Sequence, residues 1–443
     1  MAQRANPREK ALEILKHTEE GTFADSLLDQ SRKDFDTRDN AFILEIVYGI
    51  LRNRTRLDWV LDCFSAQPVA KTDIWTRNIL RLGAYQMLFL DRVPVSAAVN
   101  TSTELAKTHG KKDRYVNGLL RNLDRKRATV IWPDPVDRVK QLSVLYSHPA
   151  WLVRRWVTRF NPDIAETLLR ENNRPAPLII RTNTLKTTRD KLKESLATEG
   201  VIAIETAYSP VGLEITSGAV ITSLTSYRDG WFMVQDQAAQ LVSLLLAPQP
   251  GETVLDACAA PGGKATHIAE LMKDQGKLVA LESDPARVRK ISENSARLGI
   301  TCIISVTGDA AAYRGEVFDR ILIDAPCSGL GVLRRHPDGR WNKQEHTIRE
   351  RQALQSKILE NCADLLKPGG ILVYATCTTE PEENEEVIKA FLDRQGVRFA
   401  IEDPRPFLPS EAARFVNEAG YFHTFPNEPS MDGFFGVRLA KKK

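Results

Sequence analysis

The stretch TVLDACAAPGGKATHIAELM, residues 253–272, decides the fold. An apolar run ends in a loop with two adjacent glycines, and a segment with helical spacing follows directly. The glycines allow the backbone to approach a ligand closely, and the first amides of the helix are exposed there. The loop has neither the G-x-G-x-x-G fingerprint nor the Walker A pattern, so it predicts neither a dinucleotide site nor a P-loop.

Outward from this loop, short apolar runs alternate with helical patterns of ten or more residues, which predicts a doubly wound parallel sheet. The runs lie at residues 253–258, 277–283, 319–326 and 370–377. In such sheets, ligands bind beyond the carboxyl ends of the strands.

Acidic residues stand at successive strand ends of this predicted sheet. Glu282, at the end of the second strand, is placed to accept hydrogen bonds from a ribose diol. A third strand, which is not among these runs, ends near Asp309, which suits an adenine amino group, and the fourth ends at Asp324. A single carboxylate at a strand end is more often only solvated, but the order of these ends after a Gly-Gly loop favours a binding site.

This arrangement resembles the class I S-adenosylmethionine-dependent methyltransferases, and the AAPGGK loop resembles the RNA cytosine 5-methyltransferase family. The resemblance implies an α/β (Rossmann-like) catalytic domain with S-adenosylmethionine as cofactor and no metal. The implied cofactor-binding residues are Cys258, Ala259, Ala260, Pro261, Gly262, Gly263, Lys264, Glu282, Asp309 and Asp324.

Two further strand ends carry cysteine, in Asp324-Ala-Pro-Cys327 and in Thr376-Cys377. A cysteine beside a strand is usually a small buried hydrophobe, and we keep that interpretation for Cys63, Cys302 and Cys362. A thiol at the ligand edge has a chemical use, because thiolate addition at carbon 6 makes carbon 5 of cytosine nucleophilic. Asp324, if protonated or hydrogen-bonded to the ring N3, can offset the charge that develops during the addition. The [ND]-P-P-[YF] motif of amino-group methyltransferases is missing, which argues against an exocyclic nitrogen target.

The spacing of the two cysteines does not decide which of them attacks. DNA cytosine methyltransferases use the Pro-Cys thiol, whereas the RNA family uses the Thr-Cys thiol and leaves the other to assist product release. Because the loop and both motifs resemble the RNA pattern, the resemblance implies that Cys377 is the nucleophile and Cys327 the release cysteine. Lys264 and Asp324 would orient cofactor and base.

The rest of the chain predicts two more parts. Residues 7–145 have apolar side chains at helical spacing, and prolines between 132 and 149 mark a boundary. A small α+β unit ending near Gly230 follows, with strands at 178–183, 201–206 and 212–216 and a helix at 188–199. We therefore expect a multidomain chain with an all-α domain (1–145), a small α+β RNA-recognition unit (146–232) and a methyltransferase domain (233–443).

Three basic segments are candidates for RNA contact. Residues 107–127 hold eight basic side chains against two acids, which suits phosphate binding, although a solvated helix face is the simpler alternative. In WLVRRWVTRF (151–160) the aromatic residues are better explained as core. RRHPDGRW (334–341), just beyond Cys327, would hold the substrate backbone while a base is flipped out. The segment RDNAFILEIVYGILRNRTRLDWVL is similar to the antitermination-factor RNA-binding family.

Composition excludes several classes of protein. The chain has 443 residues, 42% of them hydrophobic, and a formal net charge of +4. The N-terminus is polar and the sequence has no long apolar run, so we expect neither a secreted protein nor one inserted in a membrane. Six scattered cysteines without a zinc-type pair fit a reducing cytoplasm.

Over nearly its whole length the chain resembles the RNA cytosine 5-methyltransferases that act on bacterial small-subunit rRNA. The resemblance implies 16S rRNA as substrate, no binding of DNA or membranes, and a monomer. One departure is Glu282, where the family commonly has Asp. Two alternatives remain, namely a transfer RNA cytosine 5-methyltransferase, which would share the catalytic half, and a non-catalytic RNA-binding assembly factor, which would not need the thiol pair.

Overall fold

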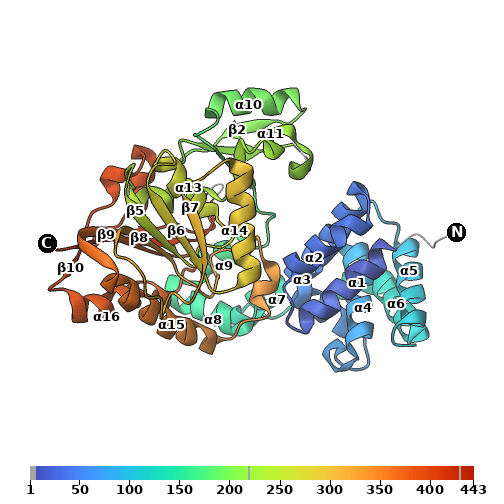
Figure 1. Cartoon of the computed structure of the whole chain (residues 1–443). Coiled ribbons are helices and arrows are strands. Elements are labelled where there is room, and N and C mark those ends of the chain that lie inside the picture. Colours follow the sequence, from blue (N-terminus) through green and yellow to red (C-terminus); the bar gives the residue numbers. More distant parts are fainter. Residues whose placement is uncertain (1–5, 218–219, 429–430) are drawn as a thin grey trace. The chain divides into compact units, whose positions relative to one another are not determined.

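The computed structural model describes residues 6–217, 220–428 and 431–443 (Figure 1). The chain divides into two compact units. The helical unit comprises Met1–Pro175 and Leu333–Gln344, and the sheet unit comprises Ala176–Val332 and Glu345–Lys443. In the described residues no helix is long and apolar enough to cross a membrane. The division into three domains stays a prediction.

The helical unit confirms the predicted all-α N-terminal part, because its described residues form helices and no strand. Asp36 and Asp73 cap two of these helices by accepting hydrogen bonds from the backbone N–H groups of Asp39 and Thr76. The α-helices are α1 (Pro7–Glu19), α2 (Ala24–Ser31), α3 (Thr37–Asp62), α4 (Ile74–Phe89), α5 (Val95–Thr108), α6 (Asp113–Lys126), α7 (Arg138–Leu145), α8 (Ala150–Phe160) and α9 (Pro162–Glu171).

Helix α6 carries most of the basic segment 107–127 on its solvent face. Its buried side chains, Val116, Leu119, Leu120 and Leu123, recur at helical spacing and pack into the core of the unit. Arg114, Arg121, Arg125, Lys126 and Arg127 are exposed. Two other cations of the segment are engaged in surface ion pairs, Lys107 with Glu104 and Lys112 with Asp73.

Residues 333–344 belong to the helical unit, and Arg340, one of the cations of RRHPDGRW (334–341), is not available to the substrate backbone. Substrate contact by the rest of this segment stays a prediction. The Arg340 side chain is fully buried and donates hydrogen bonds to the carbonyls of Ser147 and Asn172 and to Asn173 Oδ1. Trp341 Nε1 donates to the carbonyl of Leu51 at 2.7 Å. Arg340 is therefore a structural anchor that phosphate cannot reach.

The sheet unit begins with a small antiparallel sheet of strand order β2-β3-β1-β4. Its strands are β1 (Leu178–Thr182), β2 (Ala203–Glu205), β3 (Gly212–Ile215) and β4 (Phe232–Val234), with helices α10 (Arg189–Thr198) and α11 (Thr225–Arg228). Strand β4 lies beyond Gly230, where we expected this part to end. Its three residues are too few for a periodic signal.

The main sheet has the order β10-β12-β9-β8-β5-β6-β7, and β11 pairs with β12. Strands β5 to β9 are parallel as predicted, but β12 runs antiparallel to β9, so the sheet is mixed rather than all parallel. Its strands are β5 (Thr253–Ala257), β6 (Lys277–Glu282), β7 (Ile303–Thr307), β8 (Phe318–Asp324), β9 (Leu366–Thr376), β10 (Phe399–Ile401), β11 (Tyr421–His423) and β12 (Phe435–Lys441).

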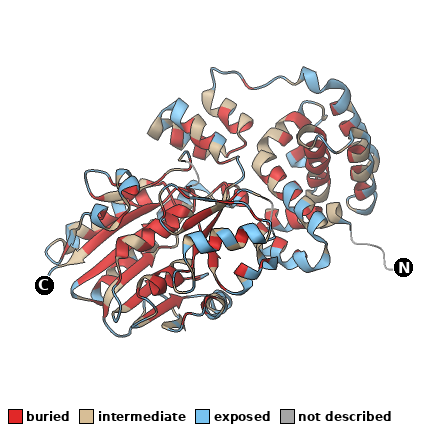
Figure 2. Cartoon of the chain, turned by 90° about the horizontal axis from the view of Figure 1, so that it is seen from above, coloured by how far each residue is buried: buried red, intermediate tan, exposed pale blue. Residues whose placement is uncertain are grey.

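Alternate side chains of each central strand enter two different cores, as the period of a strand requires. On β5, Val254 packs in the core that includes α12 (Gln237–Leu246), α13 (Gly263–Leu271) and α14 (Pro285–Leu298). Leu255 packs in the other core, with α15 (Glu345–Asp364) and α16 (Glu385–Gln395). Figure 2 shows the strands buried between these helices. The carboxyl ends of β5, β6, β7, β8 and β9 thus share one edge.

Candidate active site

The loop after β5 has a backbone that only glycine allows at one position. Gly262, the N-cap of α13, has φ of +100°, and a Cβ there would lie 3.3 Å from the Cα of Ile291. Ala259 and Ala260 are buried beside it. The loop therefore presents backbone rather than bulky side chains at the start of α13, as the sequence predicts.

Arg181, in the middle of β1, anchors the first turn of α13, and the sequence analysis did not identify it. Its fully buried guanidinium donates to the carbonyl of Gly263 at 2.6 Å and to Thr266 Oγ1 at 3.0 Å. It also pairs with the buried Glu270 carboxylate at 2.6 Å. The available signal was an arginine that directly follows three apolar residues in a predicted strand.

A pocket lies at the ends of β6 and β7, and it brings together three of the predicted cofactor residues. Two apolar side chains of α15, Leu354 and Ile358, complete its wall and were not predicted. The lining residues are Cys258, Leu281, Glu282, Ser283, Gly308, Asp309, Ala310, Pro326, Leu354 and Ile358. Apolar side chains beside two carboxylates suit a flat, hydrogen-bonding group such as a nucleoside.

The Glu282 carboxylate is held at the strand end from two sides. Its Oε1 accepts from the backbone N–H of Ser283 at 3.0 Å and of Asp284 at 3.2 Å. Arg287 Nη1 lies 3.2 Å from Oε2, and Arg287 Nη2 donates to the carbonyl of Ala260 at 3.0 Å. Arg287 thereby ties the glycine loop to the end of β6, a link that the sequence analysis missed.

The two predicted catalytic cysteines meet at the ends of β8 and β9. Cys327 Sγ lies 3.2 Å from Cys377 Sγ. The hydrogen bond to Cys377, burial and the nearby charges of Cys377 and Glu383 raise the pKa of the Cys327 thiol well above its usual value. The two thiols are therefore close enough to act on one substrate base.

An ion pair between Lys264 and Asp324 stands in the same neighbourhood. Lys264 Nζ lies 2.9 Å from Asp324 Oδ2 and 5.1 Å from the ring centroid of Phe434. Burial lowers the pKa of Lys264, but Asp324, together with Cys377 and Asp256, more than offsets this, so the pKa is raised. Lys264 is thus a cation between the glycine loop, Asp324 and Cys377.

The acidic groups of this site suit S-adenosylmethionine, which carries a positive charge and a ribose diol. Asp256, at the end of β5, is fully buried, and neither of its carboxyl oxygens has a hydrogen-bond partner in the described structure. Burial, with the charge of Asp324, raises the pKa of Asp256 well above its usual value. A buried acid of this kind is stabilised by a cationic ligand. The residues present therefore fit the cofactor.

The cysteines that we interpreted as buried hydrophobic residues differ in their exposure to solvent. Cys362 is buried, as expected, and Cys302 is half-buried. Cys63 is exposed next to the end of α3, so its interpretation as a buried hydrophobe was wrong.

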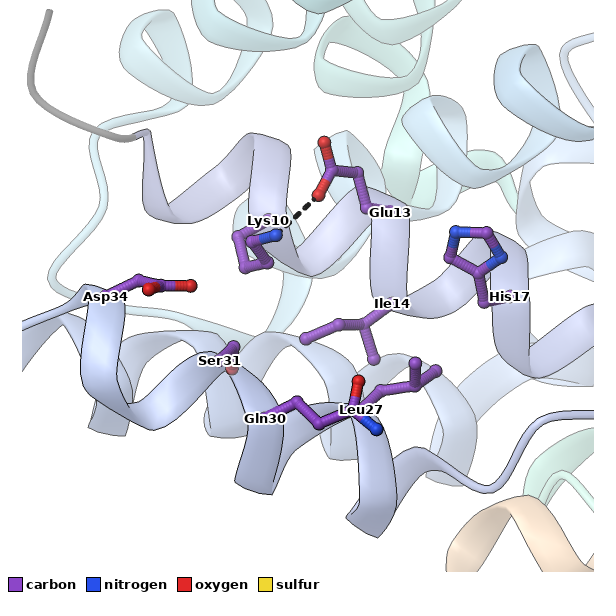
Figure 3. A pocket seen from close by; sticks show the side chains of 8 residues that line it. All are labelled: Lys10, Glu13, Ile14, His17, Leu27, Gln30, Ser31 and Asp34. Atoms are coloured by element: carbon purple, nitrogen blue, oxygen red, sulfur yellow. Dashed lines mark hydrogen bonds and ion pairs between the residues drawn. The ribbon is translucent and has the colours of Figure 1, made fainter.

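Figure 3 shows another pocket, which lies in the helical unit between α1 and the segment 27–34. Its polar wall includes an ion pair of 2.8 Å between Lys10 and Glu13. Its eight lining residues, Lys10, Glu13, Ile14, His17, Leu27, Gln30, Ser31 and Asp34, include no cysteine. It does not share the chemistry of the thiol site.

Comparison with known proteins agrees with this geometry. The family model for 16S rRNA methyltransferase RsmB/F matches residues 243–440, the NusB family matches residues 5–125, and an RsmF/B-like ferredoxin-like domain matches residues 148–222. A methyltransferase homolog protein from Pyrococcus horikoshii has a solved structure that is 29% identical, with a TM-score of 0.59, and the match covers 71% of this chain and 100% of that one.

Full-length relatives show the family. The probable ribosomal RNA small subunit methyltransferase B of Bacillus subtilis (strain 168) is 36% identical over 99% of this chain and 100% of its own length. The ribosomal RNA small subunit methyltransferase B of Escherichia coli (strain SMS-3-5 / SECEC) is 33% identical over 100% of both chains. The chain therefore belongs to the RsmB/F family of S-adenosylmethionine-dependent methyltransferases.

Proposed function

We propose that the protein methylates carbon 5 of a cytosine in 16S rRNA. The full-length relatives, which are named as small-subunit ribosomal RNA methyltransferases, support the substrate class. The observation that carries the proposal is the distance of 3.2 Å between the thiols of Cys327 and Cys377, next to the ion pair of Lys264 and Asp324. A non-catalytic assembly factor has no use for two adjoining thiols at the ligand edge of the sheet.

The thiolate of Cys377 adds to carbon 6 of the cytosine, which forms a carbon–sulfur bond and makes carbon 5 nucleophilic. Asp324, held by Lys264, orients the base at ring N3, and the Lys264 ammonium offsets the developing negative charge. S-adenosylmethionine supplies the methyl group. A base then removes the proton from carbon 5, the carbon–sulfur bond breaks, and the Cys377 thiolate leaves. We assign assistance in this release to Cys327.

The cofactor would be held by the loop Cys258, Ala259, Ala260, Pro261, Gly262, Gly263 and Lys264, with Glu282, Asp309 and Asp324. The apolar walls of the pocket, Leu354 and Ile358, would flank its adenine. Glu282 and Arg287 belong to one ion pair, so the longer Glu side chain in place of Asp reaches the arginine as well as a ribose.

The exposed cations of α6 support RNA contact by the helical part, since phosphate affinity needs clustered positive charge.

The proposal implies a cytoplasmic protein, because the ribosomal subunit that contains the substrate is assembled there. We further propose that it acts as a monomer.

Two single substitutions test the assignment of the thiols. Cys377→Ala removes the attacking sulfur, so it should abolish both methylation and the covalent protein–RNA adduct. Cys327→Ala should still attack and transfer the methyl group but release slowly, so an adduct should accumulate and survive denaturing electrophoresis. Cys63→Ala, at an exposed cysteine, is the matched control and should behave as wild type.

The reverse pattern, with the adduct trapped by Cys377→Ala alone, would show that the DNA-enzyme arrangement applies. Full activity in both variants would refute thiol catalysis. Bisulfite sequencing of rRNA and tRNA from a deletion strain separates the substrates, because loss of a methylated cytosine from tRNA alone would favour the transfer RNA alternative.

A further inference from the structure

Glu383 lies at the end of the 3-10 helix η6 (Pro381–Glu383), in the acidic run EPEENEE at residues 380–386. Its side chain is fully buried. Oε1 accepts the backbone N–H of Ser328 at 2.7 Å and the side-chain N–H of Gln355 at 3.1 Å. Oε2 accepts the hydroxyl of Ser328. The carboxylate therefore holds the residue that follows Cys327, and it is also hydrogen-bonded to Thr378. Burial raises the pKa of Glu383, and these hydrogen bonds oppose the rise.

The next residue, Asn384, is hydrogen-bonded to the loop that contains Cys377. Its Oδ1 accepts the hydroxyl of Thr376 at 2.6 Å, and its Nδ2 donates to the carbonyl of Thr378 at 3.0 Å. These two threonines stand on either side of Cys377. One buried Glu-Asn pair thus fixes both loops, and Ser328 Oγ lies 2.9 Å from Thr378 Oγ1 between them.

The two thiols have different charged neighbours. The carboxylate of Glu383 accepts the backbone N–H of Ser328, directly after Cys327, whereas Cys377 is among the groups that raise the pKa of Lys264, the cation paired with Asp324. Tyr374, whose hydroxyl donates to the carbonyl of Glu383 at 2.7 Å, is the further titratable group beside Cys327. A negative neighbour disfavours a thiolate and a positive neighbour favours it.

We propose that Glu383 is a positioning residue that decides which thiol ionises, because its buried carboxylate keeps Cys327 neutral while Lys264 favours the thiolate of Cys377. This inference rests on the proposed function, since it explains why the nucleophile would be Cys377. The charge of Glu383 is among the causes that raise the pKa of Cys327. The neutral Cys327 thiol, at 3.2 Å, can then donate a hydrogen bond to the Cys377 thiolate.

The test compares Glu383→Gln with the wild type in the full chain, without RNA or cofactor. The amide keeps the size of the side chain and the acceptor for Ser328 and Gln355 but removes the charge. Its new N–H₂ group can donate to the Ser328 hydroxyl, which can turn its hydrogen to Thr378. Glu386→Gln, at a half-exposed glutamate paired with Arg349, is the matched control, and Glu383→Asp keeps the charge.

The measurement is the rate of alkylation by iodoacetamide against pH, with the peptides of Cys327 and Cys377 separated by mass spectrometry. In the wild type, Cys377 should react first. In Glu383→Gln the apparent pKa of Cys327 should fall by about one unit, so that its rate relative to Cys377 rises about tenfold at neutral pH. The Glu386→Gln and Glu383→Asp proteins should keep the wild-type order.

An unchanged profile for Cys327 in a folded Glu383→Gln protein would overturn the proposal. A shift of equal size in Glu386→Gln would also overturn it, because the effect would not depend on the buried position. Alkylation uses no RNA, so this result stands apart from the adduct experiment. If methylation proved to need neither thiol, the proposed function would fail while the measured charge effect could still hold.

Discussion

We predict that the buried ion pair of Arg181 and Glu270 holds the cofactor loop in place. Arg181→Met removes the guanidinium but keeps a long apolar side chain. The Glu270 carboxylate, with a side chain only 1% exposed, then loses its cation. The carbonyl of Gly263 loses a donor as well.

The expected cost follows from this burial. Removing one partner of a buried ion pair costs about 3–5 kcal/mol, whereas an exposed pair contributes at most about 1 kcal/mol. The half-exposed pair of Arg189 and Glu205, at 2.7 Å, provides the control in the same part of the unit. Arg189→Met should therefore change stability by less than about 1 kcal/mol. Replacing both buried charges, in Arg181→Met/Glu270→Leu, should recover most of the loss because no unpaired charge remains.

The sign of the pH dependence can also be derived. Burial raises the pKa of Glu270 even though Arg181 opposes the rise, so removing Arg181 must raise the pKa further. A carboxyl group whose pKa is raised on folding destabilises the folded state as pH increases above its unfolded pKa. The deficit of Arg181→Met relative to wild type should therefore shrink as pH falls toward the usual pKa of glutamate.

Urea unfolding measures the stability, and amide hydrogen exchange at residues 263–271 reports on α13 alone. Arg181→Met should lose protection there and should bind S-adenosylmethionine more weakly. A loss of stability no larger than that of Arg189→Met, or a double variant no better than the single one, would refute the argument that this ion pair anchors the loop.

Three further predictions concern the cofactor, the RNA and the helical unit. Asp309→Ala should weaken S-adenosylmethionine binding about tenfold in calorimetry, the effect of one lost hydrogen bond to a charged group, and unchanged affinity would remove Asp309 from the site. Arg121→Glu with Arg125→Glu should weaken RNA binding and flatten its dependence on salt while cofactor affinity stays as in wild type; if neither changed, the segment is only a solvated face. Arg340→Met should destabilise the helical unit by about 3 kcal/mol, because the buried carbonyls of Ser147 and Asn172 lose their donor, and an unaltered unfolding midpoint would contradict that role.

The cofactor edge could be predicted from the sequence because its signals are local. Each central strand is a short apolar run, and the residue that matters follows the run directly, as Glu282 follows residues 277–281. Parallel strands then bring their carboxyl ends to one edge without any further information. The two thiols met for the same reason, since Cys327 and Cys377 follow neighbouring strands.

Long-range partners could not be predicted in this way. Arg340 and Arg125 both lie in basic runs, but Arg340 is buried and Arg125 is exposed. The carbonyl groups to which Arg340 donates lie about 170 to 190 positions away in the chain. Likewise, Glu383 and Glu386 stand three positions apart in one acidic run. Only the first meets Ser328 and Gln355. Local charge density does not distinguish an anchoring side chain from a solvated one.

The short distance between the two thiols depends on bonds that the strands themselves do not supply. A hydrogen bond of 2.8 Å from Ala325 N to the carbonyl of Ala375 joins β8 and β9 at their ends, and Cys327 and Cys377 lie two residues beyond it. Further out, Gly331 N donates to the carbonyl of Cys377 at 3.0 Å, and Gly433 N donates to the carbonyl of Gly331 at 2.8 Å. A Cβ at Gly331 would lie 2.1 Å from the carbonyl oxygen of Gly433, so this approach requires glycine. Because these contacts come from separate segments of the chain, the spacing of the thiols is a property of the folded sheet unit rather than of either cysteine motif.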